Sequence, residues 1–234
     1  MSDEKKAIPC KVVLIGESGV GKTSIISRYM TDTFSSTLGS TPGANFTTKT
    51  VFLKNENQSI KFEIWDTAGQ EKFRSLAKVF YKNAAICILV YEITRRASFE
   101  ELKKYWIEEV KNNGAKNISK LILIIIFLNL VLAIAANKSD MYEFEEVTEE
   151  EGVALARQIN AIFQSTSAKD QNGSIDKLFQ NLGRKFLHPN SDIGNDSGNN
   201  SKNRGTQLNS KNGGKEKKGL HRQGAASHSR WLFE

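Results

Sequence analysis

A glycine-rich turn at residues 16–23 has the composition of a loop that holds phosphate groups. It reads Gly-Glu-Ser-Gly-Val-Gly-Lys-Thr, follows a strand-like run at residues 11–15 and precedes the apolar spacing of a helix. Backbone N–H groups of such a turn, with the positive end of the next helix, form a nest for α- and β-phosphates. The lysine reaches the outer phosphates, and the hydroxyl after it binds Mg²⁺. The predicted contact residues are Ser18, Gly19, Val20, Gly21, Lys22, Thr23 and Ser24.

Three more polar turns follow apolar runs, in the order that a guanine-nucleotide site requires. Residues 66–71 begin with a metal-side carboxylate, Asp66, while residues 137–140 and 167–169 end two further runs. The Asp140 carboxylate can accept from N1–H and the 2-amino group of guanine, a donor pair that adenine does not offer. An ordinary polar loop is the alternative for each motif alone, whereas four in order favour a guanine nucleotide. The predicted base-side residues are Asn137, Lys138, Asp140, Ser167, Ala168 and Lys169.

Over residues 8–188 these motifs resemble the Rab family of small GTPases, within the Ras superfamily. Residues 65–73 look like the second switch loop of Rab proteins, and residues 40–46 are similar to the first switch loop of the endosomal branch. The resemblance implies an α/β fold, the P-loop GTPase domain, with a doubly wound, mostly parallel sheet and helices on both faces. It also implies a hinge at Gly69 and an aromatic ring, Phe34, beside the guanine.

The activity implied by the resemblance is that of a GTP-hydrolysing switch in vesicle traffic, in the cytoplasm or on the cytosolic face of endosomal membranes. Gln70 would orient the attacking water, with Lys22 and Thr41 as the other catalytic residues. Mg²⁺ would be held by Thr23, Thr41 and Asp66, with GTP or GDP as the ligand. Both switch loops would stay ordered only while the γ-phosphate is present.

The resemblance also implies three kinds of protein partner: an exchange factor, an activating protein and effectors. No arginine that would complete the transition state is identified in the chain, so hydrolysis should be slow without the activating protein. Phe46, Trp65 and Phe80 match the aromatic residues that Rab effectors contact. Ordinary core packing is the alternative for Trp65 and Phe80.

Two other functions remain open at this stage. One is a nucleotide-binding scaffold with impaired GTP cycling, which an apolar block at residues 119–130 and Pro42 make possible. Pro42 follows Thr41 directly, and proline fixes φ and lacks an N–H. The other is a P-loop kinase or ATPase, which is disfavoured because residues 137–140 suit guanine.

Apolar runs and helical spacing alternate along the chain, which predicts a doubly wound sheet with ligands at the carboxyl ends of its strands. Strands are predicted at residues 12–15, 48–53, 60–65, 85–91, 132–136 and 161–164. Amphipathic helices are predicted at residues 24–31, 99–112, 148–159 and 174–187. All four polar motifs fall where such strands end.

Composition divides the 234 residues into a charged extension at 1–7, the domain at 8–188 and a tail at 189–234. The extension has no secretory signal, and two cysteines suggest no disulfide framework. The tail holds 7 Asn, 7 Gly and 6 Ser, with 8 Lys and Arg against 4 Asp and Glu, so we expect a disordered basic arm. A membrane-facing arm and a solvated linker are both open, and no aromatic-interleaved basic surface supports nucleic-acid binding. The tail contains no cysteine for prenylation, which favours an altered C-terminus over an unanchored protein.

An apolar block at residues 119–130 interrupts the resemblance, since family members lack about twelve residues here. Residues 121–136 are uncharged, but a membrane span needs about 20 apolar residues and this run abuts Asn137. The block consists almost wholly of residues with AT-rich codons, which leads to the hypothesis of a retained intron. A genuine hydrophobic insertion is the alternative, and sequencing the transcript decides between them.

Overall fold

The computed structural model describes residues 6–67, 83–107 and 130–191. Its strands form one six-stranded sheet in the order β2-β3-β1-β4-β5-β6. Neighbouring strands are parallel except for β2 and β3, which are antiparallel. The strands are β1 (Ile8–Ile15), β2 (Ala44–Leu53), β3 (Gln58–Thr67), β4 (Ile86–Glu92), β5 (Val131–Asn137) and β6 (Ile162–Ser165).

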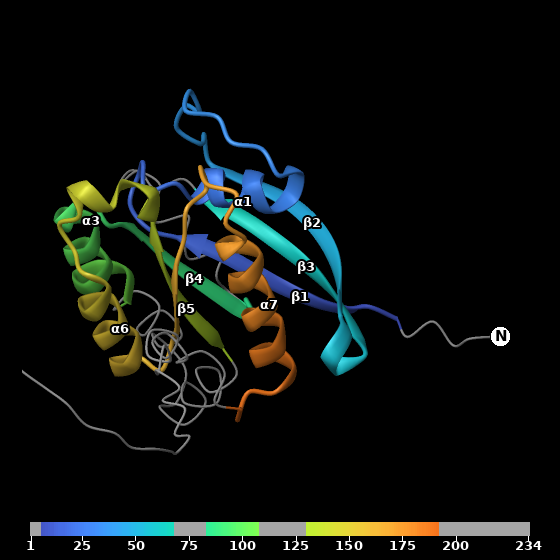
Figure 1. Cartoon of the computed structure of the whole chain (residues 1–234). Helices are drawn as coiled ribbons and strands as arrows, with labels where there is room; N and C mark the ends of the chain where they lie inside the picture. The colour runs from blue at the N-terminus through green and yellow to red at the C-terminus, as the bar shows by residue number, and fades with distance from the viewer. Residues whose placement is uncertain (1–5, 68–82, 108–129, 192–234) are drawn as a thin grey trace, which may run out of the picture. The chain divides into compact units, whose positions relative to one another are not determined.

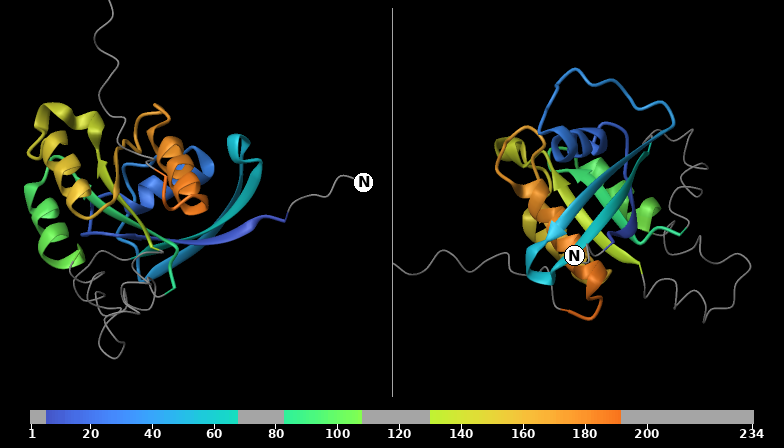
Figure 2. Two further views of the ribbon diagram at one scale, coloured as in Figure 1. Left: turned by 90° about the horizontal axis from the view of Figure 1, so that it is seen from below. Right: turned by 90° about the vertical axis from the view of Figure 1, so that its right-hand side faces the viewer.

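Helices cover both faces of the sheet (Figures 1 and 2). On one face α1 and α7 pack over the strands, and Tyr29 stacks on Phe179 with ring centroids 3.7 Å apart. On the other face Phe99 of α3 and Leu155 of α6 join a second core. The α-helices are α1 (Lys22–Thr31), α3 (Arg96–Glu101), α6 (Glu149–Gln158) and α7 (Ser174–Leu187). Shorter helical turns are η1 (Lys54–Glu56), η3 (Leu102–Trp106) and η4 (Ser139–Phe144).

The predicted α/β fold with a mostly parallel sheet is confirmed, but several bounds differ from those predicted. β2 was expected at residues 48–53 and instead starts at Ala44, because it pairs with β3 from Ala44 opposite Thr67 to Leu53 opposite Gln58. The backbone ladder, which apolar spacing does not reveal, therefore carries the strand through polar residues. The helix expected at residues 99–112 starts at Arg96, whose N–H donates to Glu146 Oε2 over 2.6 Å. It changes to a π-helical turn at η3, and its predicted end lies outside the described residues.

The strand that follows the apolar block keeps one register. β5 pairs with β4 from Val131 opposite Ile86 to Asn137 opposite Glu92, and all seven of its residues are buried. Only Leu130 of the block is described, and it is half-buried against the second core. Within residues 6–67, 83–107 and 130–191, no helix combines the length and apolar character needed to cross a membrane. The block thus leaves the strand that carries Asn137 in place.

We expect deletion of residues 119–130 to raise the soluble yield and the thermal midpoint. The block adds nine Leu, Ile and Phe residues, whereas the described residues by themselves already form a six-stranded sheet with a buried core on each face. Large apolar patches that the fold does not need promote aggregation. Each 1 kcal/mol gained should raise the midpoint by roughly 2–4 °C in a domain of this size. GDP affinity should change less than about twofold, because the register of β5 is intact.

Deletion of residues 119–129, which keeps Leu130, is the matched control for that side chain's contact with the core. Thermal melts and soluble yields of the two deletions and the full chain provide the comparison. A full chain as stable and as soluble as both deletions would identify the block as an accommodated part of the fold.

Candidate functional site

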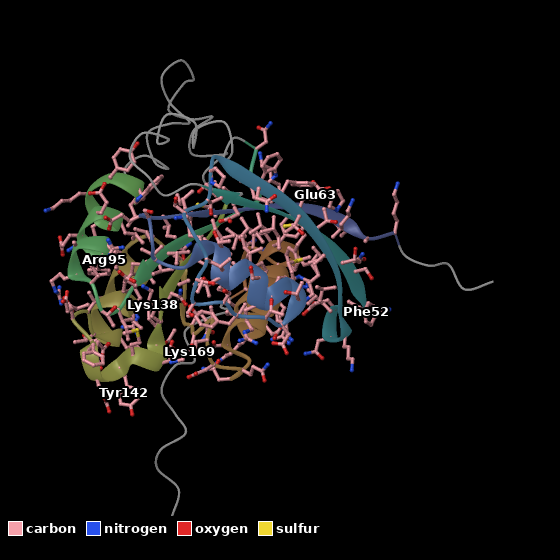
Figure 3. The ribbon with its side chains drawn as sticks, turned by 90° about the horizontal axis from the view of Figure 1, so that it is seen from above. Phe52, Glu63, Arg95, Lys138, Tyr142 and Lys169 are labelled. Carbon is pink, nitrogen blue, oxygen red and sulfur yellow. The ribbon has the colours of Figure 1, made fainter. Side chains whose placement is uncertain are left out.

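The four predicted motifs meet at one edge of the sheet. β1 ends just before the glycine-rich turn, Asp66 lies near the end of β3, Asn137 ends β5 and Ser167 closely follows β6. These strands are mutually parallel, so their carboxyl ends share an edge (Figure 1). Figure 3 shows Lys138 and Lys169 of the two base-side motifs along the same side of the molecule. The described residues of all four motifs thus lie at or just beyond strand ends, as the sequence predicted.

Two glycines give the phosphate loop its shape. Gly21 has φ 93°, and a Cβ there would lie 2.3 Å from Asn137 Nδ2. A Cβ on Gly16 would lie 2.2 Å from the carbonyl oxygen of Val90. Asn137 Nδ2 also donates to the carbonyl of Val20 over 2.8 Å. The first base-side residue therefore supports the phosphate loop directly, in a gap that admits no larger side chain.

Lys22 lies beneath the loop and is only 5% exposed. Its Nζ donates to the carbonyls of Gly16 and Glu17, both over 2.8 Å. Burial lowers the pKa of Lys22 to about 8, against the opposing charges of Asp66 and Glu17. Phosphate groups next to the ammonium would favour its charged form. Lys22 is thus held where a bound phosphate would find a cation.

The three predicted metal ligands converge although they come from separate parts of the chain. Thr23 Oγ1 lies 2.7 Å from Asp66 Oδ2 and 2.7 Å from Thr41 Oγ1, and Thr41 Oγ1 lies 3.5 Å from Asp66 Oδ2. The other carboxylate oxygen, Asp66 Oδ1, is buried and has no hydrogen-bond partner among the described residues. Burial raises the pKa of Asp66, while hydrogen bonds from Thr23 and the Lys22 charge oppose the shift. One carboxylate with two hydroxyls fits Mg²⁺, which binds oxygen ligands and takes others from nucleotide phosphates.

A cleft of about 190 Å³ opens beside these groups. Ser18, Lys22 and Thr23 line it from the phosphate loop, and Leu38 and Ser40 line it from the segment before β2. Leu38 is not among the site residues predicted from the sequence. Its only signal in the sequence was its position three residues before Thr41.

The two base-side motifs contact each other through side chains and backbone. Ser167 Oγ donates to Asp140 Oδ1 over 2.7 Å, and Lys169 Nζ lies 4.0 Å from Asp140 Oδ2. The Ser139 N–H donates to the carbonyl of Thr166 over 3.1 Å, which joins the backbones of the two loops. The Asp140 side chain is only 9% exposed. Its carboxylate is therefore fixed in orientation before any ligand binds, and Ala168 is buried beside it.

Lys138 has a left-handed backbone, with φ 64°. Its Nζ forms an ion pair with Glu92 at the end of β4, and burial lowers the pKa of the lysine. The long side chain is thus directed toward β4, the strand between β1 and β5, rather than into solvent.

The remaining predicted residues have different outcomes. Phe34 is 40% exposed and does not line the cleft, so its place beside the guanine stays a prediction. Phe46 is 49% exposed and lies 4.9 Å from Trp65 between ring centroids, so this pair forms an aromatic surface on β2 and β3. Gly69, Gln70 and Phe80 lie outside the described residues.

Arg28 of α1 supports the second base-side loop and was not predicted from the sequence. Its Nε donates to the carbonyl of Ala168 over 2.8 Å, and its Nη2 donates to the carbonyl of Lys169 over 3.0 Å. The helix that begins at the phosphate loop therefore also holds the second base-side loop. A basic residue on a helix has no sequence signal for a contact 140 residues away.

The comparisons agree with this geometry. The model of the Ras family matches residues 11–188. Ras-related protein Rab-31 of Mus musculus and Ras-related protein Rab-22A of Homo sapiens are each 43% identical over 176 residues, covering 75% of this chain and 82% of the relative. Ras-related protein RABF2b of Arabidopsis thaliana is 37% identical over 181 residues, covering 77% of this chain and 82% of that protein. The chain therefore belongs to the Ras family and is a Rab-type small GTPase, which binds GTP and hydrolyses it.

Proposed function

We propose that the cleft between the phosphate loop and Thr41 binds GTP or GDP with Mg²⁺, and that the bound nucleotide sets the state of a switch in endosomal vesicle traffic. The observation that supports this most is the meeting of Thr23 and Thr41 at Asp66, which leaves one buried carboxylate oxygen without a partner among the described residues. Such a group needs a ligand, because a buried unpaired carboxylate oxygen is costly.

In this proposal the chain's own residues hold and orient the reactants for attack of water on the γ-phosphoryl group. Mg²⁺, when bound, supplies positive charge that offsets the charge of the outer phosphates. Lys22 turns from the carbonyls of Gly16 and Glu17 to the transferring group. Gln70 orients the water for in-line attack, and GTP and water become GDP and phosphate.

Thr41 is the proposed sensor of the γ-phosphate. It lies on the segment between α1 and β2, whose large apolar residues Phe34 and Leu38 are exposed. Few core contacts hold such a segment, so bonds from Thr41 to the ligand and metal can decide its conformation. Loss of the γ-phosphate then releases the segment.

Three kinds of partner follow from this switch: an exchange factor, an activating protein and effectors. The exposed Phe46 and its neighbour Trp65 are the proposed effector surface, because they adjoin the segment that Thr41 controls. We place the protein at the cytosolic face of endosomal membranes on the strength of its similarity to proteins named Rab-22A and Rab-31.

Replacement of Gln70 with leucine tests the hydrolytic step. The variant should bind GDP and GTP within about twofold of the wild type but release phosphate at least about tenfold more slowly, since leucine cannot hydrogen-bond the attacking water. Single-turnover phosphate release from GTP-loaded protein measures the rate. Gln171→Leu is the control, because Gln171 is exposed and its amide donates to Asp32 over 3.4 Å.

Equal rates in Gln70→Leu and wild type would remove Gln70 from the mechanism. A wild type that binds GTP tightly without releasing phosphate would instead support the nucleotide-binding scaffold. The same assay therefore separates an incorrect residue assignment from an incorrect function.

A further inference from the structure

We infer that Arg95 is a positioning residue of the phosphate loop, which turns the N–H of Gly19 toward the β-phosphate of the nucleotide. The inference rests on the proposed nucleotide site. Arg95 comes from the loop between β4 and α3, and it does not line the cleft itself. Its action is therefore exerted through the backbone of the phosphate loop.

Each of three nitrogens of the Arg95 guanidinium has a different partner. Nη2 donates to the carbonyl of Ser18 over 2.9 Å, and Nη1 lies 3.1 Å from Glu17 Oε1. Nε donates to Glu92 Oε1. Two consecutive loop residues are thus held from outside by one rigid planar group, which a lysine cannot imitate.

The geometry of the peptide bond links the contact between Arg95 and the Ser18 carbonyl to the direction of the next N–H group. In a trans peptide the carbonyl of one residue and the N–H of the next point in opposite directions. The carbonyls of Gly16 and Glu17 face Lys22 Nζ, which lines the cleft, so the N–H groups that follow them face away. The Ser18 carbonyl is instead taken by Arg95, so the N–H of Gly19, a residue that lines the cleft, points away from Arg95.

Gly19 has φ 81°, and no atom of the described residues lies within 4 Å of the Cβ it lacks, so their packing does not hold it in this orientation. The hydrogen bond from Arg95 to the Ser18 carbonyl instead restrains the peptide that joins Ser18 to Gly19. Helix α1 begins later, at Lys22, so we assign the N–H of Gly19 to the outer part of the nest, where the β-phosphate lies.

Glu92 fixes Arg95 in turn. It is buried at the end of β4, where it accepts from Arg95 and also pairs with Lys138 of the base-side motif. Figure 3 shows Arg95 and Lys138 near each other on the same side of the molecule. Although Arg95 is the residue just before α3, its side chain makes no capping hydrogen bond to that helix. Substitution of Arg95 therefore removes the loop contact without removing a helix cap.

The test compares GDP with GMP, which lacks the β-phosphate. Competition with a fluorescent GDP analogue, after removal of bound nucleotide, gives both dissociation constants. We expect Arg95→Gln to weaken GDP about tenfold while GMP changes less than about twofold. Arg95→Lys should give nearly the same loss, because it keeps the charge but not the fork. The matched control is Arg96→Gln, since Arg96 pairs with Glu151 and contacts Glu146 instead of the phosphate loop.

Equal losses for GDP and GMP would indicate a general loosening of the site and overturn the inference, as would unchanged GDP affinity in Arg95→Gln. If Arg95→Lys kept the full GDP affinity of the wild type, the planar guanidinium with its several donors would not be required. A wild type that binds GDP no more tightly than GMP would overturn the proposed phosphate site and the inference together. A wild type with a strong preference for GDP that Arg95→Gln preserves would overturn the inference alone.

Discussion

Replacing Asp140 with asparagine should weaken GDP binding at least tenfold. The Asp140 carboxylate is nearly buried and accepts from Ser167 Oγ over 2.7 Å, so its orientation is fixed. An asparagine presents one acceptor and one donor where guanine offers two donors. Each hydrogen bond to a charged group contributes roughly 1.5–3 kcal/mol, and 1.4 kcal/mol corresponds to a factor of ten in affinity. GDP dissociation constants of the two proteins measure the effect.

The same variant should gain affinity for xanthosine diphosphate. Xanthine has a carbonyl at C2 instead of the amino group, so it needs a donor where guanine needs an acceptor, and the asparagine amide supplies one. The amide oxygen can still accept from Ser167, which keeps the contact between the two base-side motifs. Asp170→Asn is the control, because Asp170 is an exposed carboxylate of the loop that contains Ser167. Unchanged GDP affinity in Asp140→Asn would refute the assignment of the base site.

The chemistry of the site could be predicted from the sequence because its parts are local. The residues from Ser18 to Thr23 lie within one turn, and Asn137 and Asp140 lie within another. The apolar runs before them predict strands, and parallel strands bring their carboxyl ends to one edge. The sequence alone was therefore sufficient to predict that the separate motifs converge, but not to predict the distances between their side chains.

The residues that hold these motifs in place could not be predicted in the same way. Arg95 reaches Ser18 across 77 residues, and Arg28 reaches Ala168 across 140. Each is an arginine at a loop or on a helix, where a solvated side chain is the ordinary outcome. Only the packing of β4 beside β1, and of α1 beside the loop after β6, brings them to their partners.

The predicted starts of β2 and α3 were wrong for a related reason. The extension of β2 to Ala44 depends on its ladder with β3, and the start of α3 at Arg96 depends on Glu146. Both are contacts between segments that are distant in sequence. Apolar periodicity reports which side chains are buried, and backbone pairing extends beyond those side chains.

Replacing Thr23 with asparagine should reduce GTP affinity about a hundredfold in the presence of Mg²⁺ and affect GDP less. Thr23 Oγ1 lies within 2.7 Å of both Asp66 Oδ2 and Thr41 Oγ1, so the longer side chain displaces a ligand at the point where all three meet. The γ-phosphate depends most on the metal, because it adds charge that Mg²⁺ offsets. Losing one hydrogen bond to a charged group and leaving Asp66 unpaired together cost about 3 kcal/mol.

Thr23→Ser is the matched control, since it keeps the hydroxyl and should keep wild-type affinity. Titration of GTP and GDP with and without Mg²⁺ measures the coupling between metal and nucleotide. In the wild type, Mg²⁺ should tighten GTP binding strongly, and Thr23→Asn should lose most of that gain while its metal-free affinity changes little. A Thr23→Asn protein that gains as much from Mg²⁺ as the wild type would show that the metal is not bound at Thr23. Because Asp66 is buried and one of its oxygens has no partner within the described part of the chain, such a result would also require another cation for that carboxylate.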